Sequence, residues 1–278
     1  MIMDKTTEII IIVVVILLVI FAFRRVSGNK RKLQQEKVAL PFPDLWRDML
    51  IHKVLFYQRL NKQDKGLFEK RIQVFMATKN IEGIDVEIDD SIRLMVASSA
   101  IIPTFAFPNY TYPHVHSILI YPNSFDEEFQ TQRFEGHKEQ ILGMVGNRFM
   151  HGTVILSKPD LIIAFDGMQH KENVGIHEFV HLLDKEDGVI DGIPELLMQH
   201  RYVGPWLHEI KKETMRIEAG HSDINPYALT NNAEFLAVVS EYFFENPDKF
   251  KRRHPELYHF LSLAFDKPNV VETTIVAK

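Results

Sequence analysis

The segment His177-Glu178-Phe179-Val180-His181 combines two metal-binding side chains with one acid. On a helix, residues four apart lie on the same face one turn apart, so both imidazoles can bind one metal ion. Glu178 lies about 100° around such a helix, where its carboxylate can take a proton from a metal-bound water. The segment therefore predicts a metal site that can activate water for hydrolysis.

The neighbouring residues favour a metal over a chance pattern on a solvated helix. Phe179, Val180 and Leu182 are apolar, and burying two histidines and a glutamate among them is costly unless they coordinate something. The chain has no cysteine, so a thiolate site and a disulfide are excluded, and the ligands must be His, Asp or Glu. The expected metal is one Zn²⁺ ion per chain.

A catalytic zinc site needs a third protein ligand, and Glu234 is the favoured candidate. It lies in the segment Tyr227–Phe244, which is typical of a buried helix ending near Pro247. A carboxylate on such an apolar helix needs a partner, and a metal ion on a neighbouring helix supplies one. A competing interpretation makes Asn231 the helix N-cap and Glu234 its capping-box partner, which requires no metal.

Two other carboxylates stay open as the third ligand. Asp187 stands where a metzincin has its third ligand, but Asp184 occupies the position at which that family uses glycine. The acidic stretch 184–192 is more simply a helix exit and a turn, which can hydrogen-bond the outer nitrogens of the histidines. Glu241 lies two helical turns after Glu234 and is expected to support a ligand or to replace Glu234.

The rest of the sequence predicts an α+β domain that positions this helix, with a helical N-terminal part and a small mixed sheet. Helices are expected over 46–60, 68–76 and 91–101, and strands over 115–121, 153–157 and 161–165. Asp90 resembles the N-cap of the third helix. The strand 153–157 is a candidate edge on which a peptide substrate pairs antiparallel, and its alternative is an interior strand.

The first residues differ in character from the rest. Ile9 to Phe23 is an unbroken apolar run, followed by the basic residues Arg24 and Arg25 and preceded by mixed charges. This charge order is typical of an uncleaved anchor rather than of a signal peptide. We expect a single transmembrane helix in a bacterial-type inner membrane, with the N-terminus outside and the catalytic domain in the cytoplasm; an extracytoplasmic domain is the alternative.

The predicted organisation is a membrane anchor over 1–27, a basic and polar linker over 28–40, a peptidase domain over 41–265 and a tail over 266–278. The net charge is −5 and the globular part mixes both signs, so we expect no nucleic-acid partner. The expected partners are a peptide or protein substrate and, through the N-terminal helix, the membrane.

The chain resembles the Mlc titration factor A family of zinc peptidases, which are gluzincin-like and share an active-site arrangement with anthrax lethal factor. The resemblance covers about 41–263, and its specific landmarks are the motif His177–His181, continued by Leu182-Leu183-Asp184, and the segment Tyr227–Phe244. It implies a zincin-like fold with zinc on His177, His181 and Glu234, Glu178 as the base and the Tyr227 hydroxyl near the substrate carbonyl. From its sequence context alone, Tyr227 is equally compatible with a core aromatic.

The predicted function is zinc-dependent hydrolysis of peptide bonds at the membrane, with Glu178 as general base. The named member of the family is a soluble cytoplasmic protein that binds a glucose-responsive repressor, and this partnership is not expected to transfer to a chain with an anchor. The alternative is a catalytically weak zincin scaffold that binds a regulatory protein. Glu178 argues against it, because a purely structural metal site has no chemical need for a base.

Overall fold

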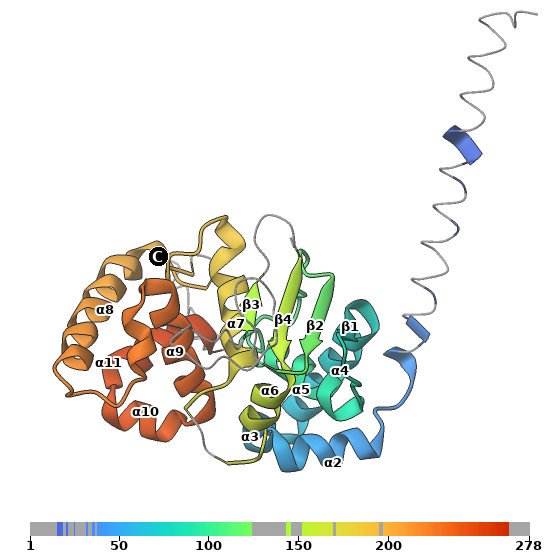
Figure 1. Ribbon diagram of the computed structural model, residues 1–278, viewed down its shortest axis with the longest axis horizontal. Coiled ribbons are helices and arrows are strands. Elements are labelled where there is room, and N and C mark those ends of the chain that lie inside the picture. The colour runs from blue at the N-terminus through green and yellow to red at the C-terminus, as the bar shows by residue number, and fades with distance from the viewer. Residues whose placement is uncertain are drawn as a thin grey trace, which may run out of the picture. The chain divides into compact units, whose positions relative to one another are not determined.

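The computed structural model describes residues 16–18, 21, 25, 32, 35–36, 38–123, 143–145, 152–168, 171–194 and 197–266. The chain divides into two compact units, Met1–Pro41 and Phe42–Lys278. The second unit contains a small sheet and the helices packed around it (Figure 1). Its combination of many helices with one small sheet agrees with the predicted α+β class.

The predicted anchor belongs to the first unit, and most of the run Ile9–Phe23 falls outside the described residues. None of the helices in the described part of the chain combines the length and the apolar character needed to cross a lipid bilayer. The transmembrane helix therefore gains no support from the structure and stays a prediction.

The second unit begins with helices α2 (Asp44–Lys53), α3 (Leu55–Arg59), α4 (Lys62–Thr78) and α5 (Asp90–Ile101). The helix expected over 46–60 is interrupted, because Val54 is extended, with φ −110° and ψ 95°. The N-cap of α5 is Asp89, whose side chain accepts from the Ile92 N–H at 3.0 Å, rather than Asp90. Asp90 instead accepts from the Trp46 indole at 2.9 Å. The cap lies one residue earlier than predicted, since an N-cap oxygen must reach the N–H two or three residues on.

The sheet has the strand order β1-β2-β4-β3 among the described residues. Its strands are β1 (Asn80–Gly83), β2 (Ser117–Tyr121), β3 (Gly143–Val145) and β4 (Thr153–Ser157). β1, β2 and β4 are parallel, while β3 runs antiparallel to β4. β4 was a candidate edge strand, but it pairs on both sides and is interior, as its buried apolar run Val154–Leu156 requires. The outer strand beside it is β3.

The prediction of a strand over 161–165 is wrong, because these residues mostly belong to helix α6 (Lys158–Ala164). Pro159 stands in the first turn, where its missing N–H breaks no helical hydrogen bond. Leu161 and Ala164 are buried while Ile163 is exposed, so one helical face packs inward. A five-residue apolar run carries no periodicity that separates a buried strand from a short helix, and no flanking residue decides between them strongly enough.

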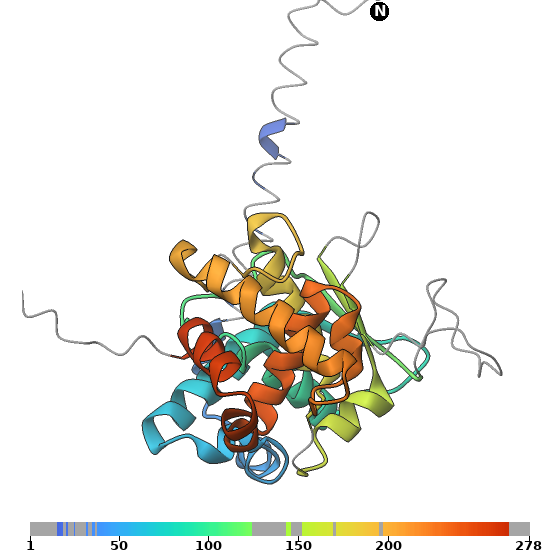
Figure 2. The same ribbon diagram turned by 90° about the vertical axis from the view of Figure 1, so that its left-hand side faces the viewer.

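The C-terminal half is helical. Its elements are α7 (Val174–Asp184), α8 (Val203–Glu218), α9 (Asn232–Glu245), α10 (Pro247–Arg253), α11 (Pro255–Phe265) and the 3-10 helices η1 (Lys185–Asp187), η2 (His200–Tyr202) and η3 (Pro226–Leu229). Helices α8 to α11, drawn in orange and red, gather on one side of the unit, and α7 runs between them and the sheet (Figures 1 and 2). This central place explains why α7 is apolar around most of its circumference.

Close packing fixes the orientation of α7. A Cβ atom on Gly175 would lie 2.0 Å from the hydroxyl oxygen of Ser99 on α5, so only glycine permits this approach. One turn later the fully buried Phe179 ring packs edge-on against Phe75 and Tyr112, at centroid distances of 5.9 and 5.0 Å. With this face committed to the core, the histidines of the motif face α9.

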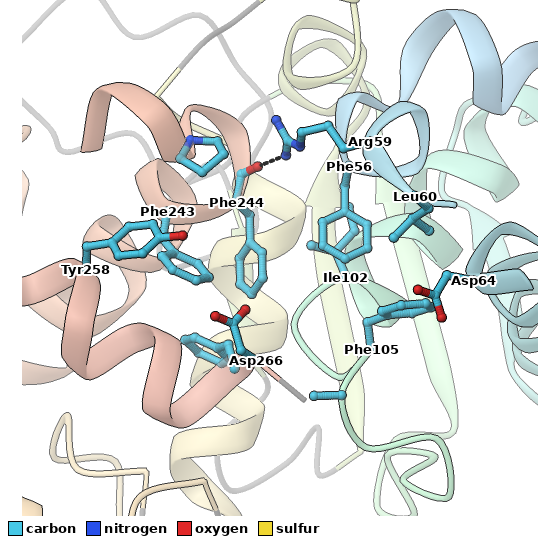
Figure 3. Close-up of a pocket in the computed structure, with 13 residues that line it drawn as sticks. Phe56, Arg59, Leu60, Asp64, Ile102, Phe105, Phe243, Phe244, Tyr258 and Asp266 are labelled. Atoms are coloured by element: carbon cyan, nitrogen blue, oxygen red, sulfur yellow. Dashed lines mark hydrogen bonds between the residues drawn. The ribbon is translucent and has the colours of Figure 1, made fainter. Parts of the chain in front are cut away.

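A cavity of about 270 Å³ separates the N-terminal helices from α9 to α11. Phe56 and Phe105 line one side, and Phe243 and Phe244 line the other (Figure 3). Arg59 donates to the Phe244 carbonyl in the last turn of α9, where a cation stabilises a helix C-terminus. This contact connects the first helices to the helix that carries Glu234 and Glu241, and neither carboxylate lines the cavity.

Candidate metal centre

The start of α7 is tied to α9 by its capping residue. Asn173 is the N-cap, and its side-chain oxygen accepts from the Ile176 N–H at 3.1 Å. The Asn173 amide nitrogen donates to Glu245 at 2.8 Å, and its backbone N–H donates to Glu241. Because both carboxylates belong to α9, the cap sets the register between the two helices that form the site.

Three side chains predicted as ligands meet at one point between α7 and α9. His177 Nε2 lies 2.9 Å from Glu234 Oε2 and 3.1 Å from His181 Nε2, and His181 Nε2 lies 3.4 Å from the same carboxylate oxygen. One ligand atom from each residue falls within 4.8 Å of the others. His177 and His181 lie four residues apart on one helix, and Glu234 lies 57 positions after His177 on another. Together they form a single cluster that can hold a metal ion.

Glu241 contacts the other side of His177. Its Oε1 atom lies 2.7 Å from His177 Nδ1. A carboxylate accepts hydrogen bonds, so Nδ1 carries a proton and Nε2 is the ring nitrogen left to bind a metal ion. Glu241 thus takes the orienting position predicted for it, and not that of the third ligand. Support of this kind fixes the ring and raises the basicity of a metal-binding histidine.

The two interpretations of Glu234 are compatible. Asn231 is the N-cap of α9, and its side-chain oxygen accepts from the Glu234 backbone N–H at 2.9 Å. The Glu234 carboxylate, however, points to His177 and His181 rather than back to the N-cap. The capping box is therefore half formed, with the bond from the Glu234 N–H to Asn231 and without the return bond from the Glu234 side chain. The first bond holds Glu234 in place and leaves its carboxylate available to a metal ion.

The electrostatics of the cluster are those of a site short of positive charge. Burial alone would raise the pKa of Glu234, but hydrogen bonds from His177 and His181 hold it well below its usual range. Burial alone would lower the pKa of His177, but the charge of Glu241 and the bond to Glu234 raise it well above its usual range. In the described part of the chain, the ion pairs of Glu234 and Glu241 are with histidines and not with lysine or arginine.

Glu178 is 5 % exposed and lies on the buried side of the motif. Burial and the neighbouring carboxylates Glu234 and Glu241 raise its pKa, although the two histidines oppose this shift. A carboxyl group with a raised pKa can hold and release a proton nearer to neutral pH than an exposed one. This property suits a group that must pick up a proton from water and give it away again.

The acidic stretch after α7 lies outside the cluster. Asp187, the metzincin-like alternative, is exposed and accepts from the Val189 N–H at 2.9 Å. Asp184 is buried and accepts from the Gly192 N–H at 2.8 Å, and burial raises its pKa to about 6. Gly192, with φ +79°, approaches Asn232 so closely that a Cβ atom would lie 2.2 Å from its carbonyl oxygen. The stretch therefore packs the exit of α7 onto the start of α9, and the expected hydrogen bonds from it to the histidines are not found among the described residues.

Tyr227 lies beside the cluster and is not a core aromatic. Its ring is 6.1 Å from the His177 ring, centroid to centroid, and 51 % of the residue is exposed. It stands in η3, where Asn225 accepts from its backbone N–H at 2.9 Å. An exposed phenol next to a buried polar cluster is placed to contact a bound molecule.

The sequence did not single out Asn173 or the loop before Tyr227. Asn173 stands just before the motif helix, and its N-cap position was detectable from the residue type. Asp223, Glu213 and His254 form a second polar cluster, which the sequence did not predict because its members lie far apart in the chain.

The family model described as glucose-regulated metallo-peptidase M90 matches residues 28–266. The chain belongs to this family. The M90 match includes the cluster and both helices that form it, so a metallopeptidase-like scaffold follows from the match, and the His177, His181 and Glu234 group provides a place for a metal ion.

Relatives support the same assignment. An uncharacterised protein of Synechocystis is 30 % identical over 229 residues, which cover 80 % of this chain and 83 % of that protein. Mlc titration factor A of Escherichia fergusonii is 29 % identical over 224 residues, or 77 % of this chain and 82 % of its own length. Mlc titration factor A of Salmonella arizonae is 29 % identical over 225 residues, or 77 % and 87 %. The predicted resemblance to this family is confirmed.

Proposed function

We propose that the protein is a zinc-dependent peptidase whose metal is held by His177, His181 and Glu234. The observation that carries this proposal is the convergence of two imidazole Nε2 atoms and one carboxylate oxygen within 4.8 Å on two packed helices. Membership of a metallopeptidase family supports it independently.

The residues present suit a zinc ion. Two imidazoles and one carboxylate form the ligand set of peptidases whose zinc keeps a fourth position open for water or substrate. The cluster holds the buried carboxyl groups of Glu178 and Glu241 and the half-buried one of Glu234, so a divalent cation offsets their charge. A zinc ion bound there supplies a Lewis acid that polarises the scissile carbonyl and acidifies water.

Two side chains complete the proposed chemistry. Glu178 takes the proton of the attacking water and passes it to the leaving amine, which is the work of a general base that then acts as an acid. The Tyr227 hydroxyl donates a hydrogen bond to the substrate carbonyl oxygen as negative charge develops on it. Its exposure and its place beside His177 support this role.

Peptides are the substrate class favoured by the sheet. Among the described residues β3 is the outer strand, runs antiparallel to β4 and contacts α7, the helix that carries His177 and His181. An extended peptide can add to such a strand through main-chain hydrogen bonds, which select for backbone rather than for side chains. β3 replaces β4 as the proposed site of peptide pairing.

The test compares wild type with Glu178→Gln on a peptide library, with metal content measured on both proteins. Glutamine keeps the size of glutamate but cannot accept the proton, so we expect hydrolysis to fall by about 10²- to 10⁴-fold with zinc content unchanged. Leu207→Ala, an exposed position on α8, serves as a control and should hydrolyse the library as wild type does. Equal hydrolysis by Glu178→Gln and wild type would contradict the proposal.

A second candidate function rests on the printed names of the relatives. Several are called Mlc titration factor A, which points to regulation through binding of another protein. If the scaffold serves binding alone, Glu178→Gln should retain full binding of a protein captured from the native cell extract, and wild type should not cleave the peptide library. Cleavage of the peptide library by wild type would support the peptidase over the binding scaffold.

A further inference from the structure

Asp223, in the loop between α8 and η3, is surrounded by hydrogen-bond donors. Its carboxylate oxygens lie 2.9 Å from His254 Nε2, 3.0 Å from the Tyr242 hydroxyl and 3.0 Å from Lys171 Nζ. Two further cations approach the same carboxylate, Arg253 at 3.1 Å and Lys249 at 3.4 Å. Only 18 % of the Asp223 side chain is exposed. One carboxylate therefore joins the segment before α7 to α9 and α10.

His254 extends this cluster to α8. Its side chain is 1 % exposed, and its Nδ1 atom lies 3.1 Å from Glu213 Oε1 while Nε2 faces Asp223. Glu213 also accepts from the Ser222 hydroxyl at 2.6 Å. The two consecutive residues Ser222 and Asp223 are thus fixed to buried groups, so the loop cannot shift without breaking several charge-assisted hydrogen bonds.

The same loop presents Tyr227 to the metal centre. Lys171 Nζ donates to the backbone carbonyl of Asp223 at 2.6 Å, and the Asn225 side chain donates to Glu172 at 2.8 Å. Both bonds end on the segment just before α7. Tyr227 lies two residues after Asn225, in the first turn of η3, so the backbone of the loop sets where the half-exposed Tyr227 side chain begins.

We infer that Asp223 is a positioning residue that holds Tyr227 beside His177 through its bonds to Lys171, Tyr242 and His254. The inference rests on the proposed function, because positioning matters only if the Tyr227 hydroxyl assists hydrolysis. Small displacements of a catalytic group reduce rates by up to about 10²-fold. Asparagine at 223 keeps the shape but loses the charge that attracts the surrounding cations, so the loop should loosen while the metal ligands stay in place.

The experiment uses the full chain loaded with zinc and the variants Asp223→Asn, Tyr227→Phe and the double variant. Glu209→Gln is the matched control, because Glu209 is a buried carboxylate of α8 that pairs with Lys212 at 3.0 Å and has no bond to the loop. Lys171→Met is a second test variant that cuts two bonds to Asp223 and leaves the others, should Asp223→Asn fail to fold.

Two readouts are expected to change together. In Asp223→Asn, kcat should fall by about 10- to 100-fold with a smaller change in KM, and in the Tyr227→Phe background the same substitution should add less than about threefold. Amide hydrogen exchange over 221–229 should be faster in Asp223→Asn, but not in Glu209→Gln, with zinc content equal in all proteins. Unchanged exchange in the loop, or fully multiplicative effects of the two substitutions on kcat, would overturn the inference.

The exchange measurement separates this inference from the proposed function. If wild type hydrolyses no peptide, the proposed function fails, and the hydrogen exchange of the loop still shows whether Asp223 holds it. If wild type is active and loop exchange in Asp223→Asn and Lys171→Met equals that of Glu209→Gln, the proposed function stands and the positioning role is refuted.

Discussion

Two polar clusters contact α9, and they differ in charge. The metal cluster consists of His177, Glu178, His181, Glu234 and Glu241. The Asp223 cluster consists of Lys171, Glu213, Asp223, Tyr242, Lys249, Arg253 and His254. The first collects three carboxyl groups around two histidines, whereas the second surrounds two carboxylates with lysines, an arginine and a histidine.

This difference distinguishes a binding site from a structural support. In the Asp223 cluster, lysine and arginine side chains lie within 3.4 Å of Asp223, and Arg216 lies 3.7 Å from Glu213, so the protein itself offsets both charges. In the metal cluster two imidazole nitrogens face each other at 3.1 Å with a carboxylate oxygen beside them, an arrangement that a cation satisfies better than a proton does. We therefore expect loss of metal affinity from changes in the first cluster and loss of folding stability from changes in the second.

The largest effect is expected for Glu234→Ala. This substitution removes one of the three proposed ligands, so zinc affinity should fall by more than about 100-fold, beyond the loss typical of outer hydrogen-bond partners. Competition titration with a zinc-binding dye measures this loss. Undiminished zinc affinity would assign the third ligand to Glu241 or Asp187 instead.

Glu213→Gln tests the other cluster. It removes the charge that faces Arg216 at 3.7 Å and His254 at 3.1 Å, so the free energy of unfolding should fall by about 1–3 kcal/mol. Chemical denaturation of the metal-free protein measures the loss, and zinc affinity at 25 °C should stay within about twofold of wild type. A drop in zinc affinity comparable to that of Glu234→Ala would show that the two clusters are not separate in function.

A smaller loss is expected for Glu241→Gln. Glutamine no longer offers a charged acceptor to His177 Nδ1, and the loss of such a partner reduces metal affinity by about 10- to 100-fold. The same dye titration measures it. A result equal to that of Glu234→Ala would place Glu241 among the ligands, and no change would remove its orienting role.

A further effect is expected on the pH dependence of stability. Burial raises the pKa of Asp184 from its ordinary value of 3.8 to about 6, so the folded protein holds this proton more tightly than the unfolded chain does. Its contribution to stability is present below pH 4 and is lost as the pH rises to about 6. Asp184→Asn should therefore flatten the pH dependence of the unfolding free energy between pH 4 and 6. An unchanged slope in the variant would contradict this assignment.

The local parts of the site could be predicted from sequence. The His177–His181 spacing fixes a helical face by itself, and Glu234 follows from the need of a buried carboxylate for a partner. Contacts between residues far apart in the sequence were harder to predict. The Asp223 cluster joins residues that are spread from 171 to 254 in the sequence, and only the fold shows that they meet around one carboxylate. Short elements such as β1 and α6 were missed or mistaken because four to seven residues carry little periodicity.

The most direct test is anomalous diffraction at the zinc edge from crystals of the protein soaked in zinc. We predict one strong peak at about 2.0–2.2 Å from His177 Nε2, His181 Nε2 and a Glu234 oxygen, with Glu241 hydrogen-bonded to His177 Nδ1 and outside bonding distance of the zinc. A peak on the acidic stretch at Asp184 or Asp187, or no peak between α7 and α9, would contradict the account.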